Sequence, residues 1–140
     1  MSVKTNGLSG AKKRAWKEFS RFIRIRDCLE TTGSTKHGKC FTCEKIIPYQ
    51  DLHAGHFMDG RTNALLFNEQ GTHAQCSECN TAKGGNKTAY KRRMLQRYGG
   101  RVVEELQELR HRPVKYTAFD FDMERQRYKR LSEELLGGAE

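Results

Sequence analysis

Residues 40–43 read CFTC and residues 76–79 read CSEC, so the chain carries two Cys-x-x-Cys pairs separated by 32 residues. In each pair a tight turn directs two sulfurs at one point, and four thiolates complete the tetrahedron that zinc prefers, with no position left for water. A redox pair is the alternative, but neither pair lies in a βαβ pattern. We therefore predict one structural Zn²⁺, held by Cys40, Cys43, Cys76 and Cys79.

The segment between the two pairs consists of short pieces with few apolar residues. It contains an apolar turn, IIPY (46–49), an extended stretch, DLHAGHF (51–57), and a second extended stretch, THAQC (72–76), after a loop. Pieces this short cannot bury a core by themselves, and a bound metal supplies the missing stability. The pattern predicts a small zinc-bound α+β fold.

Length and composition place the chain among compact intracellular proteins. Its 140 residues suit one domain. No apolar run approaches the roughly 20 residues that span a bilayer, and MSVKTNGLSG lacks the apolar stretch of a secretory signal. Five cysteines, four of them in Cys-x-x-Cys pairs, favour metal binding in a reducing compartment. We expect a soluble, cytoplasmic protein without a membrane partner.

The positive charge is concentrated in the first hundred residues. The formal net charge is +9, and residues 1–100 hold 18 of the 26 Lys and Arg but only 8 of the 17 Asp and Glu. An uneven basic charge of this kind favours a polyanionic partner, with nucleic acid first among them.

The first predicted helix, over residues 11–28, is amphipathic and basic. Trp16, Phe19 and Ile23 recur at helical spacing, while Lys and Arg cover the other face. The apolar face is expected to pack on the domain. Arg21 and Arg24 on the charged face are candidate DNA contacts. Residues 31–39 are polar and contain glycine, which predicts a loop.

Three further helices are predicted after the second cysteine pair. Residues 86–98 form a strongly basic helix that ends at two glycines, and residues 101–111 form a second one. A third begins near Thr117, where Asp120 completes an N-terminal cap. We predict a disordered N-terminus (1–10), a core (11–100) and a C-terminal helical extension (101–140). Apolar stripes over residues 101–136 fit a homodimer interface and an intramolecular core equally well.

The order of these features resembles the HNH, or ββα-metal, nucleases on a treble-clef zinc scaffold: a strand ending in histidine, a loop, and a helix starting at a Cys-x-x-Cys followed by Asn. Within that group CFTC…HAGHF…QCSECNTAKGG resembles the phage NinG (Rap) recombination nucleases, as does the closing YTAFDFDMERQRYKRL. The resemblance covers residues 12–136. It implies a metal-dependent DNA endonuclease acting on branched recombination intermediates, such as Holliday junctions and displacement loops, in the cytoplasm of a host bacterium.

The resemblance also implies roles for individual residues. His56, which ends the strand, is the expected general base, since neutral imidazole titrates near the working pH. Asn80, directly after the last cysteine, is expected to hold a catalytic Mg²⁺ or Mn²⁺ at the scissile phosphate. This ion and the structural zinc are separate.

Two positions depart from the general HNH pattern. The residue before the base is commonly a metal-binding Asp but is Gly55 here, and Gly71 replaces the middle Asn. Because residues 53 and 55 share one face of an extended strand, the longer side chain of His53 is our second candidate ligand. Endonuclease VII looks similar in having a His three residues before its base. The rival ligands are Asp51, Asp59 and His73.

The expected DNA contacts are to phosphates rather than to bases. No helix-turn-helix or finger array is recognisable, so we expect recognition of DNA shape. A non-catalytic zinc module that binds nucleic acid, and a sequence-specific HNH endonuclease, are the alternative functions. In the second half of the core, the candidate phosphate contacts are Lys83, Lys87, Lys91, Arg92 and Arg93.

Overall fold

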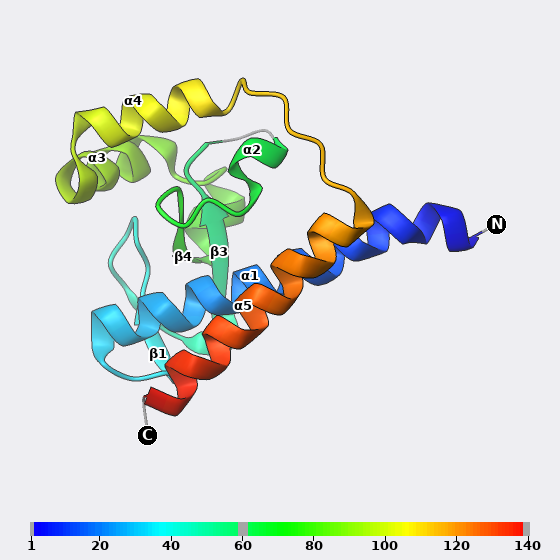
Figure 1. Ribbon diagram of the computed structural model, residues 1–140. Coiled ribbons are helices and arrows are strands. Elements are labelled where there is room, and N and C mark those ends of the chain that lie inside the picture. The colour runs from blue at the N-terminus through cyan, green and yellow to red at the C-terminus, as the bar shows by residue number, and fades with distance from the viewer. Residues whose placement is uncertain (1, 59–61, 139–140) are drawn as a thin grey trace.

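The fold is mixed α+β and mostly helical, with two small antiparallel sheets (Figure 1). The computed structural model describes residues 2–58 and 62–138, with side chains from residue 7 onward. In chain order the elements are α1 (Ser2–Thr32), β1 (His37–Lys39), β2 (Ile46–Pro48), η1 (Tyr49–Asp51), β3 (Leu52–His56), α2 (Asn63–Leu66), β4 (Thr72–Cys76), η2 (Glu78–Ala82), α3 (Lys87–Tyr98), α4 (Gly100–Leu109) and α5 (Ala118–Gly138).

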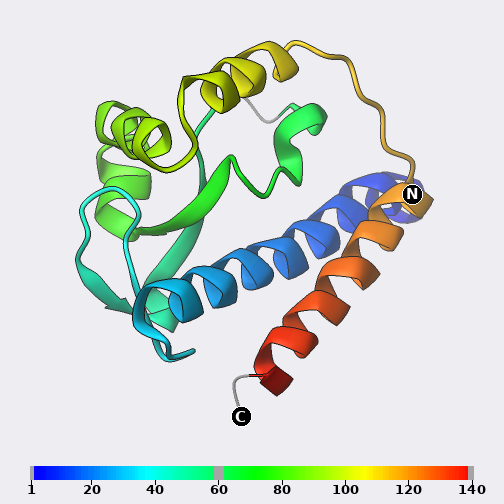
Figure 2. The ribbon, with the colours of Figure 1, turned by 60° about the vertical axis from the view of Figure 1, so that its left-hand side comes forward.

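Helix α1 runs along one side of the molecule, and α5 lies beside it over much of its length (Figures 1 and 2). The predicted stripe is the buried face of α1, because Phe19 and Ile23 are fully buried and Phe22 nearly so. The helix is longer than the predicted 11–28. Residues 7–10 belong to it, where we predict disorder, because Ala11 is already packed against Leu66 and Phe121 and holds the preceding turn.

The two sheets are hairpin-like pairs. β1 pairs with β2, so residues 37–39 form a strand where we predict a loop, because their backbone finds ladder partners in residues 46–48. β3 pairs with β4 in a register that places His53 opposite Gln75 and Gly55 opposite His73. Since side chains alternate across a strand, these four residues share one face of the sheet, and His56 lies on the other face, toward α1.

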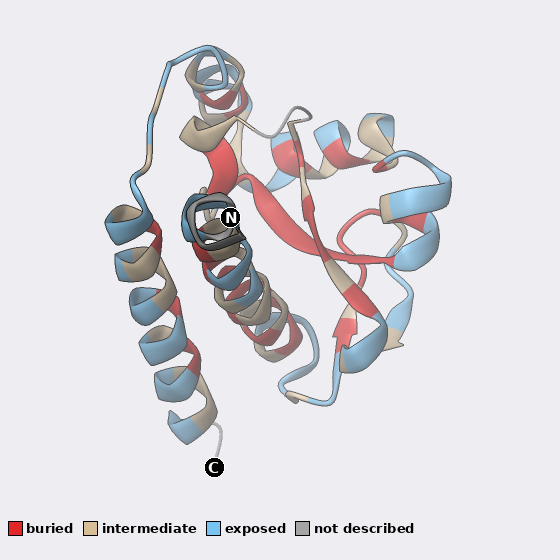
Figure 3. Cartoon of the chain, turned by 90° about the vertical axis from the view of Figure 1, so that its right-hand side faces the viewer, coloured by how far each residue is buried: buried red, intermediate tan, exposed pale blue. Residues whose placement is uncertain are grey.

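Helices α3 and α4 cover the sheet on the side away from α1 (Figure 2). Their core joins Phe41 and Phe57 to Tyr90 and Met94 of α3 and to Leu106 of α4. The strand between the helical layers, β4, is buried along its whole length (Figure 3). The strands that carry the candidate site are therefore held from both sides.

The C-terminal helices are built into the same cores. The predicted cap of α5 is present: the Asp120 amide donates to Thr117 Oγ1 at 3.1 Å, and the Thr117 amide donates to Asp120 Oδ2 at 2.9 Å. Tyr128 packs with Phe19 and donates a hydrogen bond to Glu69. The apolar stripes of α4 and α5 lie in intramolecular cores, while the predicted homodimer stays a prediction. Over residues 2–58 and 62–138, no helix combines the length and the apolar character needed to cross a membrane.

Candidate metal centre and catalytic pocket

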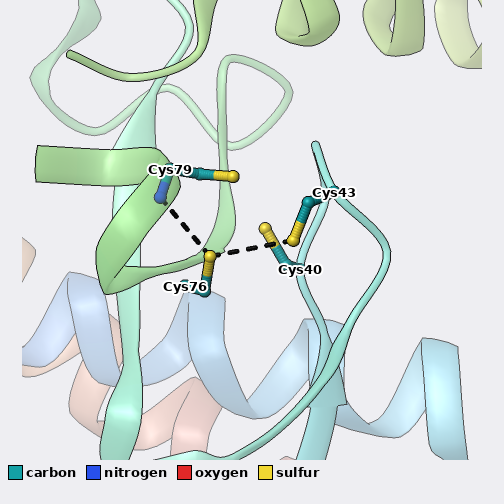
Figure 4. A group of neighbouring side chains, drawn as sticks. All are labelled: Cys40, Cys43, Cys76 and Cys79. Atoms are coloured by element: carbon teal, nitrogen blue, oxygen red, sulfur yellow. Dashed lines mark hydrogen bonds between the residues drawn. The ribbon is translucent and has the colours of Figure 1, made fainter. Parts of the chain in front are cut away.

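The four predicted zinc ligands converge on one point. Cys40 and Cys43 lie in the turn of the β1–β2 hairpin, and Cys76 and Cys79 lie at the end of β4 and in η2. Their sulfurs lie within 4.8 Å of one another and face a common space (Figure 4). Four cysteines in this arrangement can hold a metal such as zinc.

The surroundings favour the thiolate form of Cys40, whereas burial, the largest influence, and the neighbouring thiols raise the pKa of Cys43 and Cys76. Burial alone would raise the pKa of Cys40, but backbone amides and the Thr42 hydroxyl outweigh it and lower that pKa to about 6. The Cys79 amide donates to Cys76 Sγ at 3.4 Å, and Asn86 Nδ2 donates to Cys79 Sγ at 3.5 Å. These donors stabilise negative sulfur. The fifth cysteine, Cys28, is buried against Leu52 and Ala74, away from the cluster.

His56 ends β3 and faces α1. Its ring stacks on Trp16, with 5.0 Å between centroids and 28° between planes. Its Nε2 lies 3.2 Å from the backbone oxygen of Leu66. A carbonyl oxygen only accepts, so Nε2 carries the proton of the neutral ring and Nδ1 keeps the lone pair. No donor for that Nδ1 is present among the described residues.

The environment of His56 keeps it neutral. Burial lowers its pKa from the usual range, the Leu66 carbonyl opposes that change, and the positive charge of Lys87 adds to the lowering. Lys87 Nζ donates to the backbone oxygens of His56 and Phe57 at 2.6 and 2.9 Å, so it also fixes the end of the strand. Neutral imidazole with one accessible lone pair is the form of a general base.

The structure brings the other two predicted site residues together. Asn80 lies in η2, one residue after the last cysteine, and its Nδ2 lies 3.0 Å from Nδ1 of His53. Both side chains are half-buried. Asn80 Oδ1 has no protein donor in the part of the chain that the structure describes.

A third polar group faces the same space. Gly55 has no side chain, and a Cβ built there would overlap Gln75 Oε1 and lie 2.9 Å from Asn80 Oδ1. Gln75 is fully buried, and its Oε1 has no hydrogen-bond partner among the residues that the structure describes. The two amide oxygens, buried or half-buried, are neutral groups of the kind that bind divalent cations. The Nδ1 lone pair of His53 accepts the hydrogen bond of Asn80 Nδ2, so this imidazole joins them as a ligand once that bond opens. With that rearrangement the residues present fit a second metal ion.

The rival ligands are placed differently. His73 is buried, with Nδ1 bonded to Asp27 Oδ2 at 3.2 Å and Nε2 to the Tyr98 hydroxyl at 2.8 Å, so neither nitrogen is open. Burial would raise the pKa of Asp27, but the hydrogen bond from His73 and the charge of Arg26 lower it to about 2. Asp51 is exposed in η1. Asp59 lies outside the described residues.

Gly71, which stands where the HNH pattern commonly has its middle Asn, is held by hydrogen bonds of its backbone. Asn68 Oδ1 accepts a hydrogen bond from the Gly71 amide at 2.7 Å, and the Phe57 amide donates to the Gly71 oxygen at 2.8 Å. These bonds fix the start of β4 beside the end of β3. The loop is thus closed without a side chain at residue 71.

A cavity of about 650 Å³ joins His56 and Asn80. Its wall includes Lys12, Lys13 and Trp16 from α1 and Lys87 from α3. Sequence reasoning missed Lys12, Lys13 and the contact of Trp16 with His56. The basic run AKKRAW was the available signal, but it does not reveal which turn of α1 faces the strand end.

Among the predicted phosphate contacts, Lys87 belongs to the wall of this cavity, whereas Arg21 and Arg24 do not. Arg24 stacks on Tyr49 and donates to the Ser20 oxygen, which packs it against its own helix. The remaining candidates are Lys83, Lys91 and Arg92, which are exposed, and Arg93, which is half-buried and donates to the Phe41 oxygen.

Comparison with known proteins assigns the chain to a family. A family model described as "Bacteriophage Lambda NinG protein" matches residues 3–136. The chain belongs to the NinG family. The match includes both cysteine pairs, the two strands of the site and most of α5.

The chain is also similar in sequence to individual NinG proteins. The chain is 32% identical over 104 residues to protein NinG of Escherichia phage 933W and 33% identical over 106 residues to protein NinG of Salmonella phage P22. Each match covers 71% of this chain and 46% of the relative, so the chain spans about half the length of these NinG proteins. No solved structure matches the chain.

Proposed function

We propose that this NinG-family chain is a divalent-metal-dependent DNA endonuclease of the HNH type, built on a treble-clef zinc scaffold. The observation that carries the proposal is the state of His56. It is neutral, its Nε2 proton is tied to the Leu66 carbonyl, and its Nδ1 lone pair has no protein donor among the described residues, in a basic cavity that also contains Asn80.

In the proposed reaction His56 acts on water. Nδ1 takes a proton as the water oxygen attacks phosphorus, and the bond from phosphorus to the leaving sugar oxygen breaks. Trp16 and the Leu66 carbonyl fix the plane and tautomer of the ring, so the lone pair has one direction. Lys87 anchors the backbone of the base and adds positive charge beside it.

The proposed catalytic ion is Mg²⁺ or Mn²⁺, held by Asn80 and His53. When bound, such an ion stabilises negative charge on the scissile phosphate and the leaving oxygen. The zinc cysteines serve a different purpose: they fix η2, and hence Asn80, at the end of β4.

The proposed substrate is branched recombination DNA, including Holliday junctions and displacement loops. Lys12, Lys13 and Lys87 surround the cavity with positive charge, which suits phosphates of any sequence. Over much of its length α1 packs against α5, and α3 packs against α4, so these helices are engaged in the fold. This favours recognition of shape over a sequence-specific HNH endonuclease.

A cleavage assay tests the proposal. Purified protein is incubated with a four-way junction, a flap and a matched linear duplex, each with Mg²⁺ and with EDTA. We expect nicks in the branched substrates that require Mg²⁺, and little cleavage of the duplex. Binding of all three without any cleavage would instead support a non-catalytic zinc module.

A further inference from the structure

The side chain of Gln75 fills the space left by the missing side chain of residue 55. Gln75 lies on β4 opposite His53, and its amide crosses toward Gly55 on the neighbouring strand. Its oxygen overlaps the point where a Cβ on residue 55 would stand. A side chain at position 55 therefore requires the Gln75 amide to move.

The orientation of that amide is fixed by its other end. Gln75 Nε2 donates to the Gly85 backbone oxygen at 2.9 Å and lies 3.1 Å from Thr42 Oγ1. Because the Gly85 oxygen can only accept, the nitrogen must lie on that side and the oxygen must face Gly55. The assignment of oxygen and nitrogen is therefore set by the protein.

The Gln75 oxygen lacks the partner that a buried acceptor requires. It is fully buried and accepts no hydrogen bond from any described residue, which is a costly state for an amide oxygen. Asn80 Oδ1 lies 2.9 Å from the point where a Cβ on residue 55 would stand. This oxygen also has no protein donor among the described residues. Two acceptor oxygens that face one space repel each other unless a cation or a donor lies between them.

We infer that Gln75 is a ligand of the catalytic divalent metal and, with Asn80 and His53, replaces the carboxylate that an HNH site commonly carries at position 55. The inference rests on the proposed function. All three side chains are uncharged as ligands, so the ion keeps its full positive charge and depends on a substrate phosphate to complete its shell. Metal binding and DNA binding should therefore strengthen each other.

The test measures Mn²⁺ binding directly, by the loss of the free Mn²⁺ signal in electron paramagnetic resonance. The parent protein for these measurements is the His56→Ala variant bound to a four-way junction. This variant lacks the proposed base, so the junction stays intact during the measurement. We expect this parent to bind Mn²⁺, and more tightly with DNA than without it. Gln75→Met, which has similar length and no oxygen, should weaken the affinity by at least about tenfold.

Two variants separate ligation from packing. Thr42→Ser keeps the hydroxyl that contacts both Gln75 Nε2 and Cys40 Sγ and removes only a buried methyl group beside the amide, so its Mn²⁺ affinity should match that of the parent. In Gly55→Asp/Gln75→Ala the smaller residue makes room for a carboxylate, and Mn²⁺ binding should return to the parent level or above. Gly55 has no positive φ, so its backbone accepts Asp.

Zinc content and unfolding temperature report the fold of each variant. A folded Gln75→Met protein that binds Mn²⁺ like the parent overturns the inference and leaves the proposed function standing. If Gln75→Met does not fold, the double variant decides, and a folded double variant without Mn²⁺ binding overturns the inference. A parent that binds no Mn²⁺ with or without DNA removes the metal chemistry of the proposed function itself.

Discussion

The imidazole of His56 has a fixed tautomer and a fixed plane before any substrate arrives. Stacking on Trp16 sets the plane, and the Leu66 carbonyl holds the Nε2 proton. Burial, the largest influence, lowers the pKa, and so does the charge of Lys87. The ring therefore remains the neutral base at pH values where an exposed histidine is already protonated.

This lowered pKa predicts the pH dependence of cleavage. Because the base form persists as pH falls, the acid limb of kcat/KM should lie below the ordinary histidine value of about 6.5. Initial rates between pH 5 and 8 with saturating Mg²⁺ measure it, and zinc content at each pH is the control. An inflection above 6.5 with zinc retained would contradict the assignment of His56.

His53 and Asn80 should affect metal affinity rather than proton transfer. His53→Ala and Asn80→Ala each remove a proposed ligand, so each should raise the Mg²⁺ or Mn²⁺ concentration for half-maximal cleavage by roughly tenfold or more. Titration of the metal in the cleavage assay measures this. Asp51→Ala is the matched control, since Asp51 is exposed and should leave the titration unchanged.

At the scale of residues, the sequence indicates which side chains are candidates for the site, but it does not indicate which side chains contact one another. The resemblance to the HNH nucleases makes His56 and Asn80 candidate site residues, and the period of a strand adds His53 as a third. Nothing in the sequence marks Gln75, because its meaning depends on the register of β3 against β4 and on the empty position at Gly55. Only the fold excludes His73 as a ligand, because both of its nitrogens are bonded there.

At the scale of elements, the four clustered cysteines bring the turn of the β1–β2 hairpin together with β4 and η2. The strands involved are three and five residues long, too short to hold this geometry alone. Cys76→Ser should therefore lose the zinc and the cooperative unfolding transition, because a structural zinc contributes folding energy directly. Metal analysis and thermal unfolding check this. A folded, zinc-loaded Cys76→Ser protein would contradict it.

The first turns of α1 should carry part of the phosphate binding. Lys12 and Lys13 line the cavity, so Lys12→Ala/Lys13→Ala should weaken the binding of every DNA sequence alike. The slope of the logarithm of the binding constant against the logarithm of the salt concentration should also fall. The expected decrease is about 0.9 for each phosphate that is no longer neutralised. Binding between about 50 and 200 mM salt measures the slope. Lys129→Ala/Arg130→Ala, exposed on α5, is the control with equal reduction of charge and should keep the slope.

The ends of α3 and the start of α5 are predictable because caps are local signals, whereas α1 extends beyond both of its predicted ends. The glycines after residue 98 end α3, and Thr117 with Asp120 begins α5. The strand at 37–39 is not predictable in this way, since its sequence is polar and only pairing with residues 46–48 makes it extended.

At the scale of the whole molecule, α5 packs along α1, and α1 carries Trp16, which stacks on His56. Phe19 is the centre of this contact, packed edge-on against Phe67 and Tyr128. The sequence predicts both helices but not their pairing, because the stripes suit a dimer as well as a core. Nothing in the periodicity of α5 distinguishes α1 from a second chain.

Phe19→Ala should cost about 3–5 kcal/mol of unfolding free energy, because it leaves a cavity between α1 and α5. Denaturant unfolding measures it. Phe119→Ala is the matched control, since Phe119 is 70% exposed and should change stability by no more than about 0.5 kcal/mol. Equal stability of the two variants would show that the α1–α5 contact is not part of the folding core.

The most direct test of the proposed nuclease is single-turnover cleavage of a junction by His56→Ala at saturating protein and Mg²⁺. Removal of a general base should lower the rate by about 10²–10⁴-fold, while zinc content, unfolding temperature and junction affinity stay unchanged. A His56→Ala protein that cleaves at the wild-type rate would contradict the account.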